Sequence, residues 1–493
     1  MLHERSSGVL LHPTSFAGPH GIGDLGPAAY RWVDTLVAMG CRYWQVLPLG
    51  PTGYGDSPYQ CFSSFAGNPL LISPDLLIST GLLTAPLDTP EFPAASVDYG
   101  PTIEWKTGLL TKAFEAFADN PHPELEAEFE YFLSAESFWL DNFSMFMVIK
   151  AEQGGGSFTD WAEPLRDRHP AALAKVRQSS AADLRQVAFW QFLFFKQWAE
   201  LRSYATGRGI RIIGDLPIFV SPDSADVWAN RDLFELDEIG KATLITGVPP
   251  DYFSATGQLW GNPQYRWGAH HDQNFSWWIQ RLAATLRFVE LVRIDHFRAF
   301  ADYWEIPAGS PTAETGRWVD GPGETFFNTV AEHFPEMPII AEDLGEISQA
   351  VFDLRDRFQL PGMKILQFAF DGDLDNPFLP HYFPENCVVY TGTHDNDTTV
   401  GWWMASDEET RHQARLYLSI DGSDIAWDLI RAGWHSRAAL AIAPLQDLLR
   451  LDSTARMNVP GEPAGNWSWR MADDQIPESV VESMRDLNVQ TRR

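Results

Sequence analysis

The first part of the chain alternates between helical periodicity and short apolar runs. Residues 24–40 predict a helix, because apolar side chains recur on one face, with Asp24 as its cap and Gly40 at its end. The apolar run 43–49 that follows predicts a buried strand, and residues 70–72 predict a second, shorter one. A helix followed closely by a buried strand is typical of α/β proteins.

Residues 103–207 have helical periodicity and two stretches rich in aromatic side chains. These aromatic residues are Phe129, Phe132, Phe138 and Trp139 in the first stretch, and Phe189, Trp190, Phe194 and Trp198 in the second. Helical stripes of this kind are far more often part of a core than of a binding face. We therefore predict a largely helical insertion over about 75–205, with helices of the main domain mixed into it.

Apolar runs of strand length recur through the second half of the chain. They cover residues 210–220, 289–295, 338–342, 363–370, 388–391 and 440–445. Strands that are apolar on both faces are typical of a parallel sheet covered by helices. Asp295, Glu342 and Asp395, which end or follow three of these runs, are 47 and 53 residues apart, about one strand–helix unit enlarged by insertions, which predicts a (β/α)8 barrel.

The segment 247–257 lies between two of these predicted strands. Gly and Pro stand at its ends, with Tyr252 and Phe253 between them, which suits a lid over a cleft. An ordinary connecting loop is the alternative. We predict that an insertion over about 221–285 carries this loop, and that residues 1–493 form one barrel with its insertions.

The composition narrows the classes of partner. The chain has 493 residues and a net charge of −30, from 36 basic and 66 acidic side chains. So acidic a surface repels phosphate backbones, and we expect no nucleic-acid partner. The simplest interpretation of the charge is that it keeps the protein in solution.

The cysteines and the apolar segments bear on the cellular location. Cys41, Cys61 and Cys387 are widely spaced and give neither a disulfide framework nor a zinc pattern. The N-terminus has too short an apolar stretch for a secretion signal, and no segment of about 18 apolar residues is present to span a membrane. We therefore expect a soluble cytoplasmic protein without a membrane partner.

Three of the predicted strands lead to a carboxylate. These are Asp295, Glu342 and Asp395. Side chains at the C-terminal ends of different barrel strands converge on one site. Glycosyl transfer with retention needs a carboxylate nucleophile and a carboxylic acid, so the pattern indicates chemistry on glycosidic bonds. The alternative for any one of these acids is that it caps the following helix.

The neighbours of the three acids suggest different roles. Arg293 shares a strand face with Asp295, so we expect it to lower the pKa of Asp295 and keep a nucleophile ionised. Glu342 ends an apolar strand, so desolvation should raise its pKa and suit an acid/base catalyst. Asp395 lies in a polar loop and could bind ring hydroxyls. Asp343 should point away from the site, toward the surrounding structure.

A metal site is the competing interpretation of part of this pattern. The triplet Asp395-Asn396-Asp397 resembles a metal-binding motif of some nucleotide-sugar transferases, but no Gly-rich nucleotide loop accompanies it. The calcium-loop pattern and His-Glu-x-x-His are absent, and the pair His270-His271 has no further ligands nearby. We expect neither a metal nor another cofactor.

A further set of motifs lies outside the acidic segments. It comprises Ser-Pro-Tyr-Gln (57–60), Phe-Ala-Gly-Asn-Pro (65–69), Gly-Asp-Leu-Pro-Ile-Phe-Val (214–220), Gly-Val-Pro-Pro-Asp-Tyr-Phe-Ser (247–254), Leu-Trp-Gly-Asn-Pro (259–263) and Gly-Asn-Trp-Ser-Trp-Arg (465–470). From about Gly8 to Arg470 the chain resembles the 4-α-glucanotransferases of glycoside hydrolase family 77, called amylomaltases or disproportionating enzymes. The resemblance implies a (β/α)8 TIM barrel with inserted, mostly helical subdomains and no C-terminal β-domain.

The resemblance also implies roles for individual residues. Asp295 would be the nucleophile, Glu342 the acid/base and Asp395 the stabiliser of the transition state. The implied substrate-binding residues are Tyr59, Ser57, Asp215, Arg293, His296, His394, Trp260, Gln258, Tyr252, Phe253, Asp371, Asn466 and Tyr54, the last at a second glucan-binding groove.

The implied reaction transfers a segment of an α-1,4-glucan to the 4-hydroxyl of an acceptor through a covalent glucosyl–Asp295 intermediate, and it can also form cycloamyloses. Donors would be maltooligosaccharides, amylose or glycogen-derived glucans, and acceptors glucose or glucans. We expect a monomer or a weak homo-oligomer. The alternatives are a retaining hydrolase of the α-amylase type and an inert glucan-binding barrel; the lid sequence opposes the first, and the retained carboxylates oppose the second.

Overall fold

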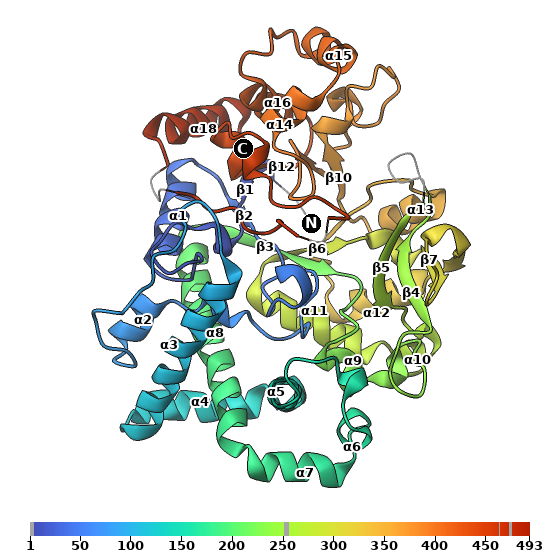
Figure 1. Cartoon of the computed structure of the whole chain (residues 1–493). Coiled ribbons are helices and arrows are strands. Elements are labelled where there is room, and N and C mark those ends of the chain that lie inside the picture. The colour runs from blue at the N-terminus through green and yellow to red at the C-terminus, as the bar shows by residue number, and fades with distance from the viewer. Residues whose placement is uncertain (1–3, 251–255, 463, 473–475) are drawn as a thin grey trace.

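A computed structural model describes residues 4–250, 256–462, 464–472 and 476–493, and its centre is a parallel sheet of eight strands (Figure 1). Their order is β10-β11-β12-β1-β2-β3-β6-β9, so neighbours in the sheet are successive barrel strands along the chain, except that the last strand, β12, pairs with the first, β1. The strands are β1 (Ser6–Leu10), β2 (Tyr43–Gln45), β3 (Arg211–Pro217), β6 (Leu291–Asp295), β9 (Ile339–Ala341), β10 (Gly362–Ile365), β11 (Cys387–Tyr390) and β12 (Leu440–Pro444).

The two end strands of this sheet meet and close it into a barrel. The backbone N–H of Ala341 on β9 donates a hydrogen bond to the carbonyl of Pro361, just before β10, at 2.9 Å. Asp343 reinforces the seam, because its carboxylate accepts the N–H of Met363 at 2.7 Å and pairs with Arg355. The predicted (β/α)8 barrel is confirmed, and Asp343 has the structural position that we expected.

Most of the predicted strands are present, but two features near the N-terminus differ from the prediction. The sequence pattern did not identify β1, a fully buried strand of only five residues. Residues 70–72 are not a strand, because Pro69–Leu71 forms a 3₁₀ helix. Pro69 has no N–H to donate to a sheet, and the side chain of Asn68 accepts the N–H of Leu70 at 3.0 Å, which stabilises the helical turn.

The first predicted helix is α1 (Pro27–Ala38), and its cap is Gly26 rather than Asp24. The carboxylate of Asp24 accepts the N–H of Gly26 at 2.9 Å and pairs with the buried Lys106 at 3.4 Å. Asp24 therefore ties the start of the helix to the helical region beyond it. Gly40 ends the helix with a φ of +72°, a conformation in which glycine has no Cβ penalty.

The region between β2 and β3 is helical, as the periodicity predicts. Its helices are α2 (Pro74–Ser79), α3 (Tyr99–Asp119), α4 (Pro123–Ala135), α5 (Ser137–Glu152), α6 (Glu163–Arg166), α7 (Pro170–Ser179) and α8 (Ala181–Gly207). The aromatic stripes pack against each other: Phe129 and Phe189 are both fully buried, with ring centroids 5.3 Å apart. Phe138 is the exception in its stretch, since 46% of its surface is exposed.

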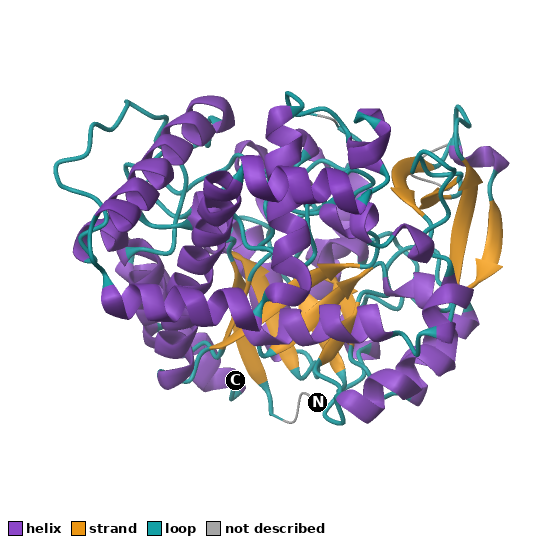
Figure 2. Cartoon of the chain, turned by 90° about the horizontal axis from the view of Figure 1, so that it is seen from below, coloured by secondary structure: helices purple, strands orange, loops and turns teal. Residues whose placement is uncertain are grey.

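A second sheet, which the sequence pattern did not predict, lies to one side of the barrel (Figure 2). It is antiparallel, in the order β5-β4-β7-β8, and consists of β4 (Leu244–Val248), β5 (Gln258–Pro263), β7 (Asp302–Pro307) and β8 (Arg317–Asp320). The predicted lid lies between β4 and β5, but Tyr252 and Phe253 fall outside the described residues. The antiparallel sheet thus fixes both ends of the segment that carries them.

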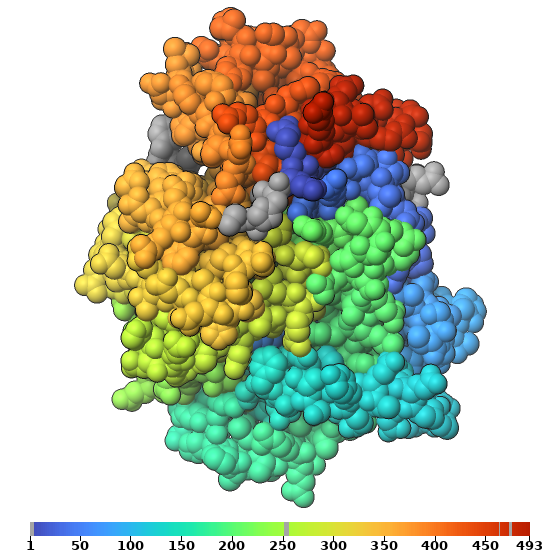
Figure 3. All heavy atoms as spheres, turned by 180° about the vertical axis from the view of Figure 1, so that it is seen from behind, coloured from blue at the N-terminus to red at the C-terminus, as the bar shows by residue number. Residues whose placement is uncertain are grey.

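The remaining helices follow or flank the barrel strands. They are α9 (Ala225–Ala229), α10 (Trp267–Asp272), α11 (Ser276–Phe288), α12 (Gly323–His333), α13 (Gln349–Arg357), α14 (Thr399–Ala405), α15 (Glu408–Leu418), α16 (Ile425–His435), α17 (Leu445–Leu448) and α18 (Glu478–Thr491). Figure 3 shows the N-terminal segment beside α18, where Ser7 donates a hydrogen bond to Asn488 at 2.6 Å. Within the described part of the chain, no helix is long and apolar enough to cross a membrane.

His270 on α10 is a buried titratable group in the aromatic core beside the barrel. Its ring is 1% exposed and lies 5.2 Å from the ring of Tyr265 and 5.4 Å from that of Trp267. Burial lowers the pKa of His270 to about 4, below its ordinary value of 6.5. The folded protein therefore holds this imidazole neutral at pH values where the unfolded chain would protonate it.

We predict that His270 makes the fold sensitive to acid. A depressed folded-state pKa stabilises the fold above the unfolded value of 6.5, and this contribution is lost as the pH falls from there toward 4. Replacing His270 with Phe should reduce the loss of stability between pH 7.5 and pH 5 by about 2 kcal/mol. Thermal unfolding across that range measures the effect.

The control for this experiment is the neighbouring residue, His271, whose side chain is 64% exposed. His271→Phe should leave the pH dependence of the unfolding temperature as it is in the wild type. An H270F protein with an unchanged pH dependence would contradict the prediction.

Candidate active site

The three predicted catalytic acids lie at the C-terminal ends of barrel strands. Asp295 is the last residue of β6, Glu342 follows the adjacent strand β9, and Asp395 lies in the loop after β11. Glu342 accepts the backbone N–H of His296, the residue after Asp295, at 2.6 Å. This hydrogen bond holds the Glu342 carboxyl against the end of the strand that carries Asp295.

Arg293 is the centre of the charge network in the site. Its strand, β6, pairs with β3 so that Arg293 lies opposite Asp215. The Nη1 of Arg293 donates to both carboxylate oxygens of Asp215, at 2.8 and 2.7 Å, and lies 3.1 Å from the Oδ1 of Asp295. The hydroxyl of Tyr59 also donates to Asp215, at 2.8 Å. The buried Asp215 therefore directs the Arg293 guanidinium toward Asp295.

The pKa of Glu342 is shifted in the direction that the sequence predicts, whereas the pKa of Asp295 is not. Burial raises the pKa of Glu342 from its ordinary 4.5 to about 6, although Arg293 and two backbone N–H donors oppose the shift. Burial also raises the pKa of Asp295, against the pull of Arg293. The expected low pKa of Asp295 is wrong because burial raises it and the nearby carboxylates add to the rise, and Arg293 does not offset the two.

Asp395 is held by groups that the sequence pattern did not single out. Asn458 donates from its side-chain amide to the Oδ1 of Asp395 at 2.6 Å, and Arg456 donates to the carbonyl of Asp395 at 2.7 Å. On the other side, the Nε2 of His394 lies 3.3 Å from the Oδ2 of Asp395. The segment 453–458 comes from far along the chain, so only the fold brings it to this loop.

Aromatic rings pack behind and beside this acid. Tyr59 stacks on His394 with 5.1 Å between ring centroids and an interplanar angle of 14°. Trp467 lies against both rings, at 5.6 Å from Tyr59 and 5.9 Å from His394. The buried Trp467 was not among the predicted site residues, although it lies in one of the motifs. These contacts fix the position of His394 next to Asp395.

His296, Trp260 and Gln258 form another side of the site. The ring of Trp260 on β5 meets that of His296 edge to face at 4.7 Å, and its indole N–H donates to Gln258 at 3.2 Å. His296 has a φ of +54°, in the left-handed region that non-glycine residues seldom adopt. Burial lowers the pKa of His296 to about 3, so the imidazole is neutral. The antiparallel sheet thus places Trp260 and Gln258 of β5 beside His296 at the end of β6.

Four predicted substrate-binding residues make their described contacts elsewhere. Asn466 uses its amide within the loop that it belongs to, accepting the N–H of Val459 at 2.9 Å. Asp371 is exposed and accepts the N–H of Asp373 at 3.0 Å. Tyr54 is 80% exposed, and Ser57 accepts the N–H of Tyr59 at 3.2 Å. Among the described contacts of these four residues, only that of Ser57 involves a residue bonded to Asp215, because Ser57 accepts the N–H of Tyr59.

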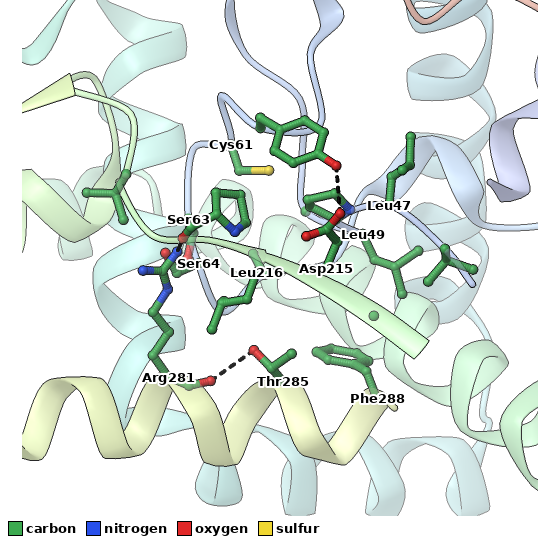
Figure 4. Close-up of a pocket in the computed structure, with 18 of the residues that line it drawn as sticks. Leu47, Leu49, Cys61, Ser63, Ser64, Asp215, Leu216, Arg281, Thr285 and Phe288 are labelled. Carbon is green, nitrogen blue, oxygen red and sulfur yellow. Dashed lines mark hydrogen bonds between the residues drawn. The ribbon is translucent and has the colours of Figure 1, made fainter. Parts of the chain in front are cut away.

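A cavity of about 70 Å³ has Tyr59 and Asp215 among the residues that line it. Figure 4 shows Asp215 on one side of it and Thr285 and Phe288 of α11 on the other. The described lining contains none of the three predicted catalytic acids. We therefore attribute this cavity to the packing between β3 and α11, and not to the substrate site.

The side chains of the candidate metal triplet have hydrogen-bond partners within the protein. In the triplet 395–397, Asn396 accepts the N–H of Thr393 at 2.8 Å and Asp397 accepts the hydroxyl of Ser453 at 2.7 Å. In the described residues, only Glu163, Asp167 and His169 form a group with suitable spacing. Asp167 there already pairs with two arginines, Arg166 at 2.9 Å and Arg231 at 2.8 Å.

Comparisons with known proteins agree with this geometry. The family model of glycoside hydrolase family 77, described as 4-alpha-glucanotransferase, matches residues 11–475. The 4-alpha-glucanotransferase of Thermus thermophilus is 50% identical and covers 99% of both chains, and that of Synechocystis sp. is 49% identical, covering 97% of this chain and 95% of the relative. The solved amylomaltase from Streptococcus agalactiae in complex with acarbose has a TM-score of 0.96 at 38% identity and covers 99% of this chain and 100% of its own.

The match begins just after β1, covers the other seven barrel strands, and includes every strand that carries or precedes a predicted catalytic acid. Proteins that share only a fold can have little sequence identity, so the identity found here indicates common family membership. By its sequence over nearly its whole length and by its structure, the chain belongs to glycoside hydrolase family 77, the 4-alpha-glucanotransferases.

Proposed function

We propose that this chain transfers segments of α-1,4-glucans to the 4-hydroxyl of an acceptor glucan or glucose, with retention of configuration. The observation that carries the proposal is the pairing of two carboxyls in different settings. Asp295 contacts a guanidinium, whereas Glu342 is buried and accepts the N–H of the residue after Asp295. Retaining glycosyl transfer requires such a pair, in which one carboxylate attacks and one carboxylic acid protonates.

The first step breaks the glycosidic bond of the donor. Asp295 attacks the anomeric carbon and forms a glucosyl ester, while Glu342 gives its proton to the departing glycosidic oxygen. Asp395, fixed by Asn458 and His394, accepts hydrogen bonds from the hydroxyls of the distorted ring. Trp260 and His296 supply an aromatic wall for the same sugar.

The protonation of the two acids follows from their contacts. Asp295 and Glu342 interact electrostatically and therefore titrate as a pair, in which the first charge to form goes to the member that cations stabilise most. Arg293 touches Asp295, so the charge belongs on Asp295 and the proton on Glu342. The raised pKa of Glu342, about 6, keeps that proton available near neutrality.

The second step returns the glucosyl group to an acceptor. Glu342, now ionised, takes the proton of the acceptor 4-hydroxyl, and the acceptor oxygen attacks the anomeric carbon, which breaks its bond to Asp295 and releases the carboxylate. Transfer outcompetes hydrolysis if bound sugar excludes water. We assign this exclusion to the lid segment with Tyr252 and Phe253, between β4 and β5.

Donors are, in this proposal, maltooligosaccharides, amylose or glycogen-derived glucans, and acceptors are glucose or glucans. The solved relative from Streptococcus agalactiae binds acarbose, which supports a site for a linear oligosaccharide. We further propose a cytoplasmic protein that acts as a monomer or weak homo-oligomer, with Tyr54, Asp371 and Asn466 contacting substrate away from the bond that breaks. The alternative function is a retaining α-1,4-glucan hydrolase, which would use the same acids.

The products from maltotriose in the presence of EDTA test the function. We expect glucose together with a ladder of longer maltooligosaccharides, because the covalent intermediate passes to another sugar. Chromatographic separation of the products measures this outcome. Glucose and maltose without longer products would instead establish the hydrolase.

We predict that Asp295→Asn abolishes turnover while glucan binding persists. The amide cannot form the glucosyl ester, but it keeps the shape of the side chain. The expected loss in kcat is at least about 10⁴-fold, as for removal of a nucleophile that acts with a partner. Turnover of maltotriose and calorimetric binding of a longer maltooligosaccharide are the two measurements.

The second replacement in this experiment is Asp343→Asn, at the adjacent acidic residue. Asp343 binds the barrel seam, so D343N should lower the thermal stability and keep measurable turnover. If D295N retained near-normal activity, Asp295 would not be the nucleophile.

We predict that kcat/KM falls above pH 6. The first step needs protonated Glu342, and its pKa of about 6 places the loss of that proton on the alkaline side of the profile. The fraction of active enzyme should decrease about tenfold per pH unit well above that value. Measuring kcat/KM with maltotriose as a function of pH tests this decrease, the alkaline limb of the profile.

The matched variant is Glu342→Gln with two kinds of donor. E342Q should lose most activity on maltotriose, but much less on a glucosyl donor whose leaving group needs no proton. The alkaline limb should also be absent for the activated donor. An E342Q enzyme that loses both activities equally would contradict the role of Glu342 as the acid.

A further inference from the structure

A patch of exposed apolar side chains lies outside the site described above, in the segment between β10 and β11 and on α15. Leu374 is 80% exposed, Tyr382 47% and Tyr417 38%, and His381 is exposed beside them. Single exposed apolar residues are ordinary on protein surfaces, but a contiguous patch marks a binding surface. We call Leu374, His381, Tyr382 and Tyr417 the aromatic shelf.

The shelf is held together by its own contacts. His381 stacks on Tyr417, with ring centroids 5.7 Å apart and an interplanar angle of 29°, and its Nδ1 lies 2.7 Å from the Tyr417 hydroxyl. The ring of Tyr382 lies 4.1 Å from that of His381, and its hydroxyl donates to the carbonyl of Leu374 at 3.2 Å. Rings that are fixed before a ligand arrives lose little entropy when it binds.

The shelf is connected to the loop that carries Asp395. Its segment starts at the C-terminal end of β10, where Gln367 donates to the carbonyl of Asp397 at 2.9 Å. Farther along, the ring of Phe370 lies 6.1 Å from that of Tyr417. Figure 1 shows α15 at the outer edge of the molecule, so this path leads from the catalytic end of the barrel outward.

The charges around the shelf select the kind of ligand. Asp375 lies 3.3 Å from the Tyr382 hydroxyl, and Asp371 and Asp373 belong to the same loop. These carboxylates, on a chain with a net charge of −30, repel anionic polymers. A neutral polyol suits them, because its hydroxyls donate to carboxylates while the apolar faces of its sugar rings pack on aromatic rings.

We propose that the aromatic shelf is an auxiliary binding site for a long α-glucan chain whose other end occupies the active site. The inference rests on the proposed function for the identity of the polymer. The shelf adds affinity through a second contact on the same chain, which a short sugar cannot reach. The shelf should therefore increase the affinity for long glucans and have no effect on the affinity for maltotriose.

The test compares two replacements of one residue. Tyr382→Ala removes the ring, whereas Tyr382→Phe keeps the ring and removes only the hydroxyl that binds Leu374 and Asp375. We expect Y382A to weaken the binding of long linear amylose about three- to tenfold, the scale of one aromatic contact. Y382F should bind amylose as the wild type does, and both should keep the wild-type kcat/KM for maltotriose.

The control is Tyr131→Ala on α4, another exposed tyrosine, which is 77% exposed and should leave amylose binding unchanged. Migration in native gels containing amylose, with calorimetry for the dissociation constant, gives the affinities. Wild-type amylose binding by Y382A, or equal weakening by Y382F, would overturn the proposal. A wild type that binds amylose but forms no longer products from maltotriose would refute the proposed function and leave the shelf intact.

Discussion

The ion pair between Arg293 and Asp215 is the interaction on which the site depends. Both side chains are almost fully removed from water, and their strands are neighbours in the barrel. A buried guanidinium without a partner would cost several kcal/mol, so the pair must form for β3 and β6 to pack here. Its geometry leaves Arg293 in contact with Asp295, and Tyr59 with its hydroxyl on Asp215.

Several other features follow from this pair. Tyr59 is held by Asp215, and its ring in turn supports His394, which lies beside Asp395. One buried pair thus connects the loop after β2, the end of β6 and the loop after β11. The shared buried pair therefore fixes the positions of the two loops and of the strand end relative to one another.

Much of the fold could be predicted from the sequence, because barrel strands are buried on both faces and can be identified as apolar runs. The strand β1 was missed because its first three residues, Ser6, Ser7 and Gly8, are not apolar and so give no apolar run of strand length. The antiparallel sheet was missed for another reason: β8 is largely exposed, and β5 carries polar residues of the site. Such strands are stabilised by pairing with their neighbours in the sheet, and their own sequences lack the apolar pattern that would predict them.

The same distinction applies to the site. Asp295, Glu342 and Asp395 could be located because strand ends have a fixed place in a barrel. Asn458 and Arg456 could not, because nothing in their own segment indicates that it folds back onto Asp395. The direction of the Asp295 pKa shift could not be predicted either, since it depends on how deeply the folded chain buries Asp295 and on the carboxylates that surround it.

Different features of the fold set the orientation and the acidity of Glu342. Its carboxyl accepts the N–H groups of His296 and Leu344, at 2.6 and 3.2 Å, and such donors favour the ionised form. Burial outweighs them and raises the pKa. The left-handed backbone of His296, which costs on the order of 1 kcal/mol, is the conformation in which its N–H meets the carboxyl. The strain therefore orients the acid, while its protonation is set by the apolar strand behind it.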